Sequence, residues 1–305
     1  MVEPFIPAAD EVTKVERGYD LGSNVYWKIR KRHFSHLPTT QGTYIVTPSG
    51  ILIDNGHNHT PNELIKFLAN GLKKYKALSK KERLGSPVGG NSKTARSKYP
   101  KDGLVLKVTL REIYSPRPTG RRARGIVECN QDFAWFGKDE AAQFLSATLK
   151  RGETHDIPAA LMMRLAKYHF LDTVRTFCDP YPDRCVKTAK LTSTVLSVSK
   201  NLVSIRLNGA VHSAQDDTPR WGIVREARIP RRPERSFDAT LLGYATYDKN
   251  QQKFTKFDLV VLGTHTGGGT QFLAGPVTMG IVLSLAGESP IDHVEPRHLS
   301  LYGWK

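Results

Sequence analysis

The sequence lacks the features that would assign it at once to a membrane or secreted class. Its 305 residues contain no apolar run near the roughly 20 residues that a membrane-spanning helix requires. The first residues, MVEPFIPAADEV, lack the basic and then apolar order of a secretion signal. We therefore expect no membrane partner, and a protein that is cytoplasmic as written and exported only if a leader has been removed.

Cysteine is scarce, and this excludes a disulfide scaffold. The chain has three cysteines, an odd number that leaves at least one thiol unpaired within the chain. Cys178 and Cys185 bracket the loop CDPYPDRC, and they either close a small disulfide or stay reduced. Cys129 lies in an apolar stretch, which favours an inert thiol in the core.

Acidic residues are few in one part of the chain. The formal charge is +16, and residues 71–124 carry 16 Lys and Arg against three acids. Such a segment attracts nucleic-acid phosphates or an acidic protein face, and its attraction weakens with salt. Aromatic residues are sparse there, so a solvated basic linker is the alternative. The basic patch consists of Lys73, Lys74, Lys76, Lys80, Lys81, Arg121, Arg122 and Arg124.

Residues 42–75 give the clearest local pattern. The runs TYIVT and ILID are β-rich and are separated by the turn residues PSG, which predicts a hairpin. Thr60, Pro61 and Glu63 match the start of a helix: an N-cap, a proline in the first turn and a capping-box acid. Apolar residues at helical spacing follow, so the helix should have a buried face.

This hairpin followed by a helix resembles the closing half of a thioredoxin-like domain. The resemblance covers residues 42–78 and implies a small α/β module at residues 1–78. Residues 1–43 contain no cysteine, so the Cys-x-x-Cys of that family is absent, and TTQGTY stands where the family has a cis-proline. The resemblance therefore implies a redox-inactive scaffold or binding module.

The rest of the chain predicts a second, larger domain. Residues 79–102 are rich in Gly, Pro, Ser and Lys, as expected of a basic linker, and we expect an α+β domain at residues 103–305. LVLKVTLREIY and GIVECNQDFAWF read as strands, and helices are predicted at residues 138–149 and from Pro158. Five further strand patterns after residue 187, joined by short turns, predict a curved antiparallel sheet covered by the two helices.

Histidines flank the predicted hairpin. HFSH contributes His33 and His36, and GHNH contributes His57 and His59, so the fold could bring four imidazoles together as ligands of a transition metal. No carboxylate stands at matching spacing, and solvated or capping histidines are the alternative. We expect no cofactor, with a transition metal at these four residues as the competing hypothesis.

The glycine run GTHTGGGTQF follows a strong strand. It lacks the following helix and lysine of a phosphate-binding loop, which favours a mobile binding loop at the end of the sheet. The loop contains His265, Gly267, Gly268 and Gly269. Binding clefts are often lined by such loops, so we expect His265 to face a cleft.

No motif names a reaction. Possible acid–base partners are scattered along the chain: Glu128, Asp132, Asp172 and Asp258. A Cys–His–carboxylate site could combine Cys129, either His265 or His169, and a carboxylate, but the spacing does not select it. We therefore expect a non-catalytic binding or accessory protein. The alternatives are an enzyme or metal-binding protein with a His/Cys site between the domains, and nucleic-acid binding through residues 71–124.

Overall fold

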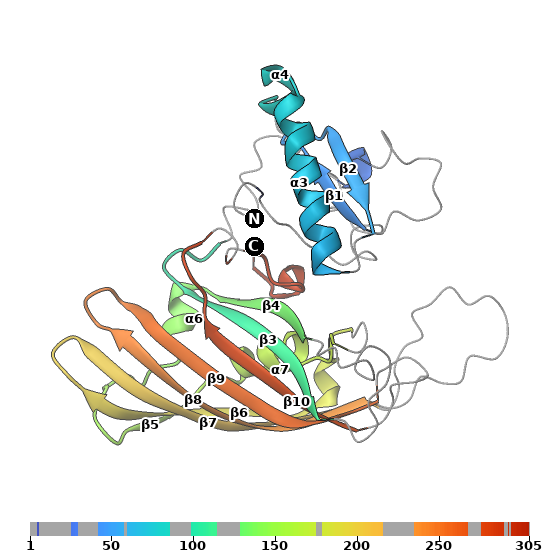
Figure 1. The fold of residues 1–305 in the computed structure, drawn as a ribbon. Helices are drawn as coiled ribbons and strands as arrows, with labels where there is room; N and C mark the ends of the chain where they lie inside the picture. Colours follow the sequence, from blue (N-terminus) through green and yellow to red (C-terminus); the bar gives the residue numbers. More distant parts are fainter. Residues whose placement is uncertain are drawn as a thin grey trace. The chain divides into compact units, whose positions relative to one another are not determined.

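A computed structural model shows the fold of the chain (Figure 1). It describes residues 5, 26–29, 42–57, 60–85, 99–114, 129–174, 179–215, 235–267, 276–289, 292 and 294–304. The chain divides into two compact units, residues 1–99 and residues 100–305. No helix in the described ranges combines the length and apolar character needed to cross a bilayer.

The first unit contains the expected hairpin. β1 (Thr43–Val46) pairs antiparallel with β2 (Leu52–Gly56), and the backbone N–H of Gly50 donates to the carbonyl of Thr47 across the turn. α3 (Pro61–Ala77) follows, and then the short α4 (Lys80–Arg83). The elements that carry the thioredoxin-like resemblance are therefore present, and the family assignment itself stays a prediction.

The start of α3 agrees with the sequence pattern. The Thr60 side chain accepts the backbone N–H of Glu63, and the Glu63 carboxylate accepts the backbone N–H of Thr60. Pro61 occupies the first turn. The predicted capping box is confirmed, and it satisfies two backbone donors that a helix end otherwise leaves open.

Helix α3 approaches the hairpin closely at Gly71. Gly71 is buried, and a Cβ placed there would lie 2.1 Å from the Cδ1 of Ile45 in β1. Only a residue without a side chain lets the two elements approach this closely. The helix is otherwise mostly exposed, so this contact is central to the small core of the first unit.

The second unit is built on one eight-stranded antiparallel sheet. Its strand order is β4-β3-β10-β9-β8-β7-β6-β5 (Figure 1). The strands are β3 (Leu104–Tyr114), β4 (Cys129–Phe136), β5 (Thr154–Asp156), β6 (Val186–Val198), β7 (Leu202–Gln215), β8 (Arg235–Asp248), β9 (Lys253–Thr266) and β10 (Val277–Leu285). The predicted α+β class with a large antiparallel sheet is confirmed.

The helices α6 (Lys138–Ala142) and α7 (Ala159–Tyr168) lie on one side of the sheet, which we call the inner face (Figure 1). Their buried residues join those of all the long strands in one apolar core. Short 3₁₀ turns at Asp183–Cys185 and Leu299–Leu301 complete the described elements. The opposite side of the sheet is called the outer face. Successive side chains along each strand point alternately to the inner and the outer face.

The first helix of this unit is shorter than expected. The sequence predicts residues 138–149, but α6 ends at Ala142 and a turn follows. The Glu153 carboxylate accepts hydrogen bonds from the Ser146 hydroxyl, the Thr148 hydroxyl and the backbone N–H of Lys150. Side-chain bonds of this kind compete with the helical pattern and hold the turn instead.

Inward-facing glycines let neighbouring strands lie close together. A Cβ on Gly209 would meet the Lys190 carbonyl at 2.1 Å, and one on Gly243 would meet the Asp258 carbonyl at 2.4 Å. A Cβ on Gly263 would meet the Asp238 carbonyl at 2.1 Å. Glycines within strands mark such bends and close backbone approaches, so these three residues allow the sheet to curve.

Candidate functional site

Three side chains from distant parts of the chain form a hydrogen-bonded series on the inner face. They come from β4, from the end of α7 and from the C-terminal segment: Asp132, His169 and Tyr302. His169 Nδ1 lies 2.9 Å from Asp132 Oδ2, and His169 Nε2 is hydrogen-bonded to the Tyr302 hydroxyl. The His169 side chain is completely buried, so these two partners replace water at both ring nitrogens.

The neighbours of this series indicate where its protons lie. Asp132 Oδ1 accepts the backbone N–H of Arg297 at 3.0 Å, so the carboxylate accepts at both oxygens and His169 carries a proton on Nδ1. The Tyr302 oxygen accepts the backbone N–H of Trp135, which leaves the phenolic proton to donate to His169 Nε2. Every polar atom of the series thus has a partner.

The electrostatics of the series oppose chemistry at Tyr302. Burial, followed by the charge of Asp132, raises the pKa of the Tyr302 phenol well above 10. Burial alone would also raise the pKa of Asp132, but hydrogen bonds from His169, Arg297 and Phe133 outweigh it and lower that pKa. At neutral pH the carboxylate is therefore ionised and the phenol protonated, so Tyr302 is a poor nucleophile.

Arg164 of α7 contacts the C-terminal segment, residues 294–304, at Tyr302 and Trp304. Its guanidinium pairs with the Glu140 carboxylate and donates to the backbone carbonyl of Trp135 at 3.2 Å. The guanidinium carbon Cζ of Arg164 lies 4.6 Å from the ring centre of Tyr302 and 5.7 Å from the ring centre of Trp304. The segment is thus anchored by stacking and hydrogen bonds together.

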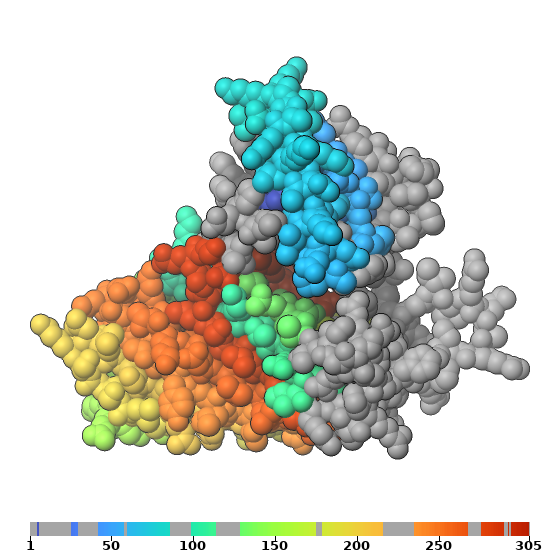
Figure 2. All heavy atoms as spheres, in the orientation of Figure 1, coloured from blue at the N-terminus to red at the C-terminus, as the bar shows by residue number. Residues whose placement is uncertain are grey.

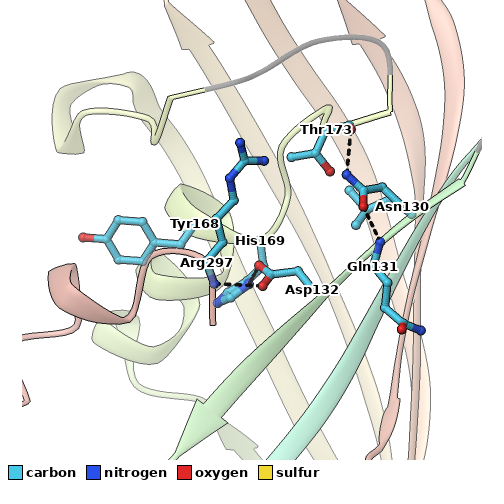
Figure 3. A pocket seen from close by; sticks show the side chains of 8 residues that line it. Asn130, Gln131, Asp132, Tyr168, His169, Thr173 and Arg297 are labelled. Carbon is cyan, nitrogen blue, oxygen red and sulfur yellow. Dashed lines mark hydrogen bonds and ion pairs between the residues drawn. The ribbon is translucent and has the colours of Figure 1, made fainter. Parts of the chain in front are cut away.

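A small pocket lined mostly by polar residues lies beside this series (Figure 3). Its volume is about 40 Å³, and it is lined from β3, β4, α7 and the C-terminal segment. The Asn130 amide at its edge donates to the Thr173 carbonyl at 2.8 Å. The pocket has room for a few water molecules and is far below the roughly 300 Å³ of a typical small-molecule site.

A second buried carboxylate–imidazole pair lies deeper in the core. His265 Nδ1 is 3.7 Å from Asp172 Oδ2, and both side chains are at most 1% exposed. The Asp172 carboxylate also accepts the backbone N–H of Val174 at 3.1 Å. The sequence named Asp132 and Asp172 as scattered acids, and the fold pairs each of them with one of the two histidines considered with Cys129.

The expectation of a binding loop at His265 is wrong for that residue. β9 continues to Thr266, and His265 lies inside the strand and is fully buried. The physical reason is the period of two: Phe257, Leu259 and Val261 face inward, and His265 continues their row. Gly267 follows the strand with a positive φ of 71°, and Gly268 and Gly269 lie outside the described residues.

The cysteines do not assemble the hypothesised Cys–His–carboxylate site within the described residues. Cys129 is exposed at the first residue of β4, which corrects the expected core thiol, because burial on this edge strand begins only at Phe133. Cys185 is buried against Leu171 and Tyr181. The predicted Cys178–Cys185 disulfide involves Cys178, which lies outside the described residues.

The metal hypothesis rests mainly on residues that the structure does not describe. His57 is exposed at the end of β2, whereas His33, His36 and His59 lie outside the described ranges. Among the residues described, no group of three or more His, Cys, Asp or Glu side chains is arranged to hold a metal ion. The four-histidine site stays a prediction from the sequence.

The first half of the basic patch lies on α3 and α4. Lys73, Lys76, Lys80 and Lys81 are exposed there, and no ion pair of theirs occurs among the described residues. Lys74 pairs with Asp54 of β2 at 2.6 Å. The remaining three members, Arg121, Arg122 and Arg124, lie outside the described ranges.

The outer face of the sheet carries an exposed apolar cluster that sequence reasoning missed. We call it the open-face patch: Ile113, Leu242, Tyr244, Val260, Leu262 and Val282. Each of these residues is 40–53% exposed, and register pairs Val282 with Val260 and Val260 with Leu242 across three strands. Figure 2 shows the side chains of β8, β9 and β10 forming one continuous surface.

Polar residues border the open-face patch. Tyr244 has Arg206 of β7 as its register partner on one side and Asp258 of β9 on the other.

A signal in the sequence could have revealed the patch. LLGY and LVVL each contain two adjacent apolar residues, where strict alternation would place a polar residue on the outer face.

Comparisons with known proteins add no assignment to these observations. No family model, no curated protein and no solved structure matches the chain. The candidate sites are therefore interpreted from their own geometry.

Proposed function

We propose that the chain is a non-catalytic binding protein whose second unit binds through the open-face patch. The observation that supports this most directly is the exposure of six large apolar side chains side by side on the outer face. Exposed apolar surface of this extent is unusual on a protein that binds nothing, because each such side chain remains in contact with water.

The hydrogen-bonded series Asp132–His169–Tyr302 supports the same proposal, because it offers no reactive group. The ring nitrogens of His169 are both occupied, Tyr302 is a protonated phenol, and Asp132 accepts hydrogen bonds at both oxygens. A general base needs an accessible atom within hydrogen-bond reach of a substrate. The cluster is better suited to fixing the C-terminal segment than to turnover.

In this proposal the first unit is an accessory module. Residues 1–78 contain no cysteine, which supports the proposal that this unit is redox-inactive. The hairpin and the capped helix α3 are consistent with that resemblance. The prediction for this unit is an absence of thiol–disulfide exchange, measured by reduction of an insulin disulfide with dithiothreitol present.

The binding surface is tested with the apolar dye 1-anilinonaphthalene-8-sulfonate and the full chain at low protein concentration. We expect dye fluorescence to rise with the native protein and to fall severalfold in the double variant Leu242→Lys, Val260→Lys. The matched control is Leu202→Lys, at a side chain that is 42% exposed at the start of β7 and does not belong to the open-face patch. Equal fluorescence from the double variant and the native protein, both folded by circular dichroism, contradicts the proposal.

A second candidate function, nucleic-acid binding by the first unit, has its own observation. Lys73, Lys76, Lys80 and Lys81 are exposed on α3 and α4 without a carboxylate partner in the described part of the chain. Phosphate binding by such residues weakens steeply as salt rises. A titration of single-stranded RNA at two salt concentrations tests it, and an affinity that salt does not change excludes this mode.

A further inference from the structure

The outer face carries opposite charges on the two sides of strand β8. In the row through Tyr244, Arg206 of β7 lies on one side and Asp258 of β9 lies on the other. In the adjacent row Leu242 stands between Asn208 and Val260. A rotation of 180° about an axis along β8, parallel to the face, exchanges the positions of β7 and β9 and keeps the direction of the strands.

We propose that a second copy of this chain covers the open-face patch, in a dimer whose two-fold axis runs along β8. The inference rests on the proposed function, because it names the partner of the same surface. The axis places Tyr244 and Leu242 against their own copies at the centre. Two sheets packed in this way have nearly parallel strands, which is the aligned arrangement of β-sandwiches.

Charge complementarity selects this partner and this axis. With the axis along β8, Arg206 of each copy faces Asp258 of the other, so two opposite-charge pairs form at once. Arg206 has no ion pair among the described residues, and Asp258 has only an exposed contact of 3.6 Å with Lys256 of its own strand. That contact contributes little in water, so the carboxylate is available to the second copy.

The available area is large enough for a specific dimer. The five strands β6 to β10, about 4.8 Å apart, and four outward rows about 6.8 Å apart cover roughly 650 Å² on each copy. The two faces together therefore bury about 1,000 Å² or more, which is the lower limit for a specific interface. Leu242 and Tyr244 lie on the axis, and Val260 and Leu262 of β9 face Asn208 and Ala210 of β7 in the other copy.

One residue opposes the association. Asp238 lies on β8 and therefore near the axis, where it would approach its own copy, and it is 77% exposed with His212 Nδ1 3.7 Å away. Like charges so placed weaken an interface. The geometry thus predicts that Asp238→Asn tightens the dimer, whereas a surface elsewhere would not respond to this change.

Charge exchange tests the proposal in the full chain by sedimentation velocity over a wide concentration range. We expect Arg206→Glu and Asp258→Arg each to weaken the dimer by about tenfold or more, because like charges then face each other at two places. The double variant should return to within about threefold of the native dissociation constant. Mixing the two single variants should give a heterodimer tighter than either homodimer, since both of its cross-pairs are opposite in charge.

Each result decides between the inference and its alternatives. A dimer that neither single variant weakens lies on another surface, and this overturns the inference. A native chain that stays monomeric, while it binds the dye and Leu242→Lys, Val260→Lys does not, overturns the dimer and leaves the proposed function standing. Loss of dye binding as the native chain associates supports both. A monomer that binds no dye overturns both.

Discussion

The inner and outer faces of the eight-stranded sheet are built from the same strands, but they differ in what their side chains contact. On the inner face the apolar residues of β3 and of β6–β10 meet α6 and α7, and the buried pair Asp132–His169 lies among hydrogen-bonding partners. On the outer face Leu242, Val260 and Leu262 remain exposed to 45–48%. The difference separates residues that stabilise the fold from residues available for binding.

The largest effect is expected from truncating an aromatic residue on the inner face. Phe144 is completely buried and packs edge-on against Phe136, Phe254 and Phe257. Phe144→Ala should lower the free energy of unfolding by about 3–5 kcal/mol, because it leaves a cavity that the core fills only in part. Urea denaturation at a fixed protein concentration measures this. Tyr244→Ala on the outer face should cost far less, and an equal loss would remove the distinction between the faces.

A smaller loss of stability is expected when the carboxylate of Asp132, on the inner face, is replaced. The lowered pKa of Asp132 means that the folded state holds the ionised form more tightly than the unfolded state, whose pKa is about 3.9. Its contribution is therefore fully present above pH 4–5 and is lost as pH falls through the folded pKa. Asp132→Asn should destabilise the protein by about 2 kcal/mol near neutral pH, since the hydrogen bonds to a charged acceptor are lost.

The pH dependence gives the control for that prediction. The native protein should lose stability below about pH 4 more steeply than Asp132→Asn does, when urea midpoints are compared between acidic and neutral pH. Glu288→Gln, a change at an exposed residue, should leave the native profile unchanged. Parallel profiles for the native protein and Asp132→Asn would show that Asp132 does not contribute to the acid dependence.

Replacing a glycine by alanine should also affect stability differently on the two faces. A Cβ on inward Gly243 would meet the Asp258 carbonyl at 2.4 Å, whereas one on outward Gly280 would meet the flexible end of Ile113 at 2.6 Å. Gly243→Ala should destabilise by about 1–3 kcal/mol, because a strand must shift. Gly280→Ala should cost less, since the Ile113 side chain can rotate. A reversed order in thermal melts would contradict the assignment of the faces.

The smallest effect is expected at the centre of the open-face patch. Val260→Ala removes two methyl groups that are already 45% exposed, so the free energy of unfolding should change by less than about 0.5 kcal/mol. The same variant should reduce dye binding, because the patch loses apolar area. A large loss of stability measured under monomeric conditions would place Val260 in the core and leave the patch without its centre.

Local patterns in the sequence predicted local structure well. The capping box at Thr60 and Glu63 was visible because its atoms are three residues apart, and β3 matched its predicted range because its pattern is continuous. The inward position of His265 was missed because the predicted strand stopped at Gly263, although the period of two continues beyond it.

Long-range pairings were not accessible in the same way. His169 meets Tyr302 across 133 residues, and Asp132 meets His169 across 37. Such contacts depend on which strands become neighbours, and hydrophobic periodicity carries no information on strand order. Sequence reasoning therefore found Asp132 and His169 as candidate groups but did not pair them, and it did not name Tyr302.

The strand order also affects when the second unit can fold during synthesis. Its first two strands, β3 and β4, are synthesised early, but they join the rest of the sheet only through β10. The pairing of β10 with β3 links residues 106–114 to residues 278–285. Closing so long a loop is slow compared with forming a hairpin. During synthesis the pairing edge of the β3–β4 hairpin therefore stays open until residue 285 has left the ribosome. This interval is when the second unit is most exposed to aggregation and to chaperones.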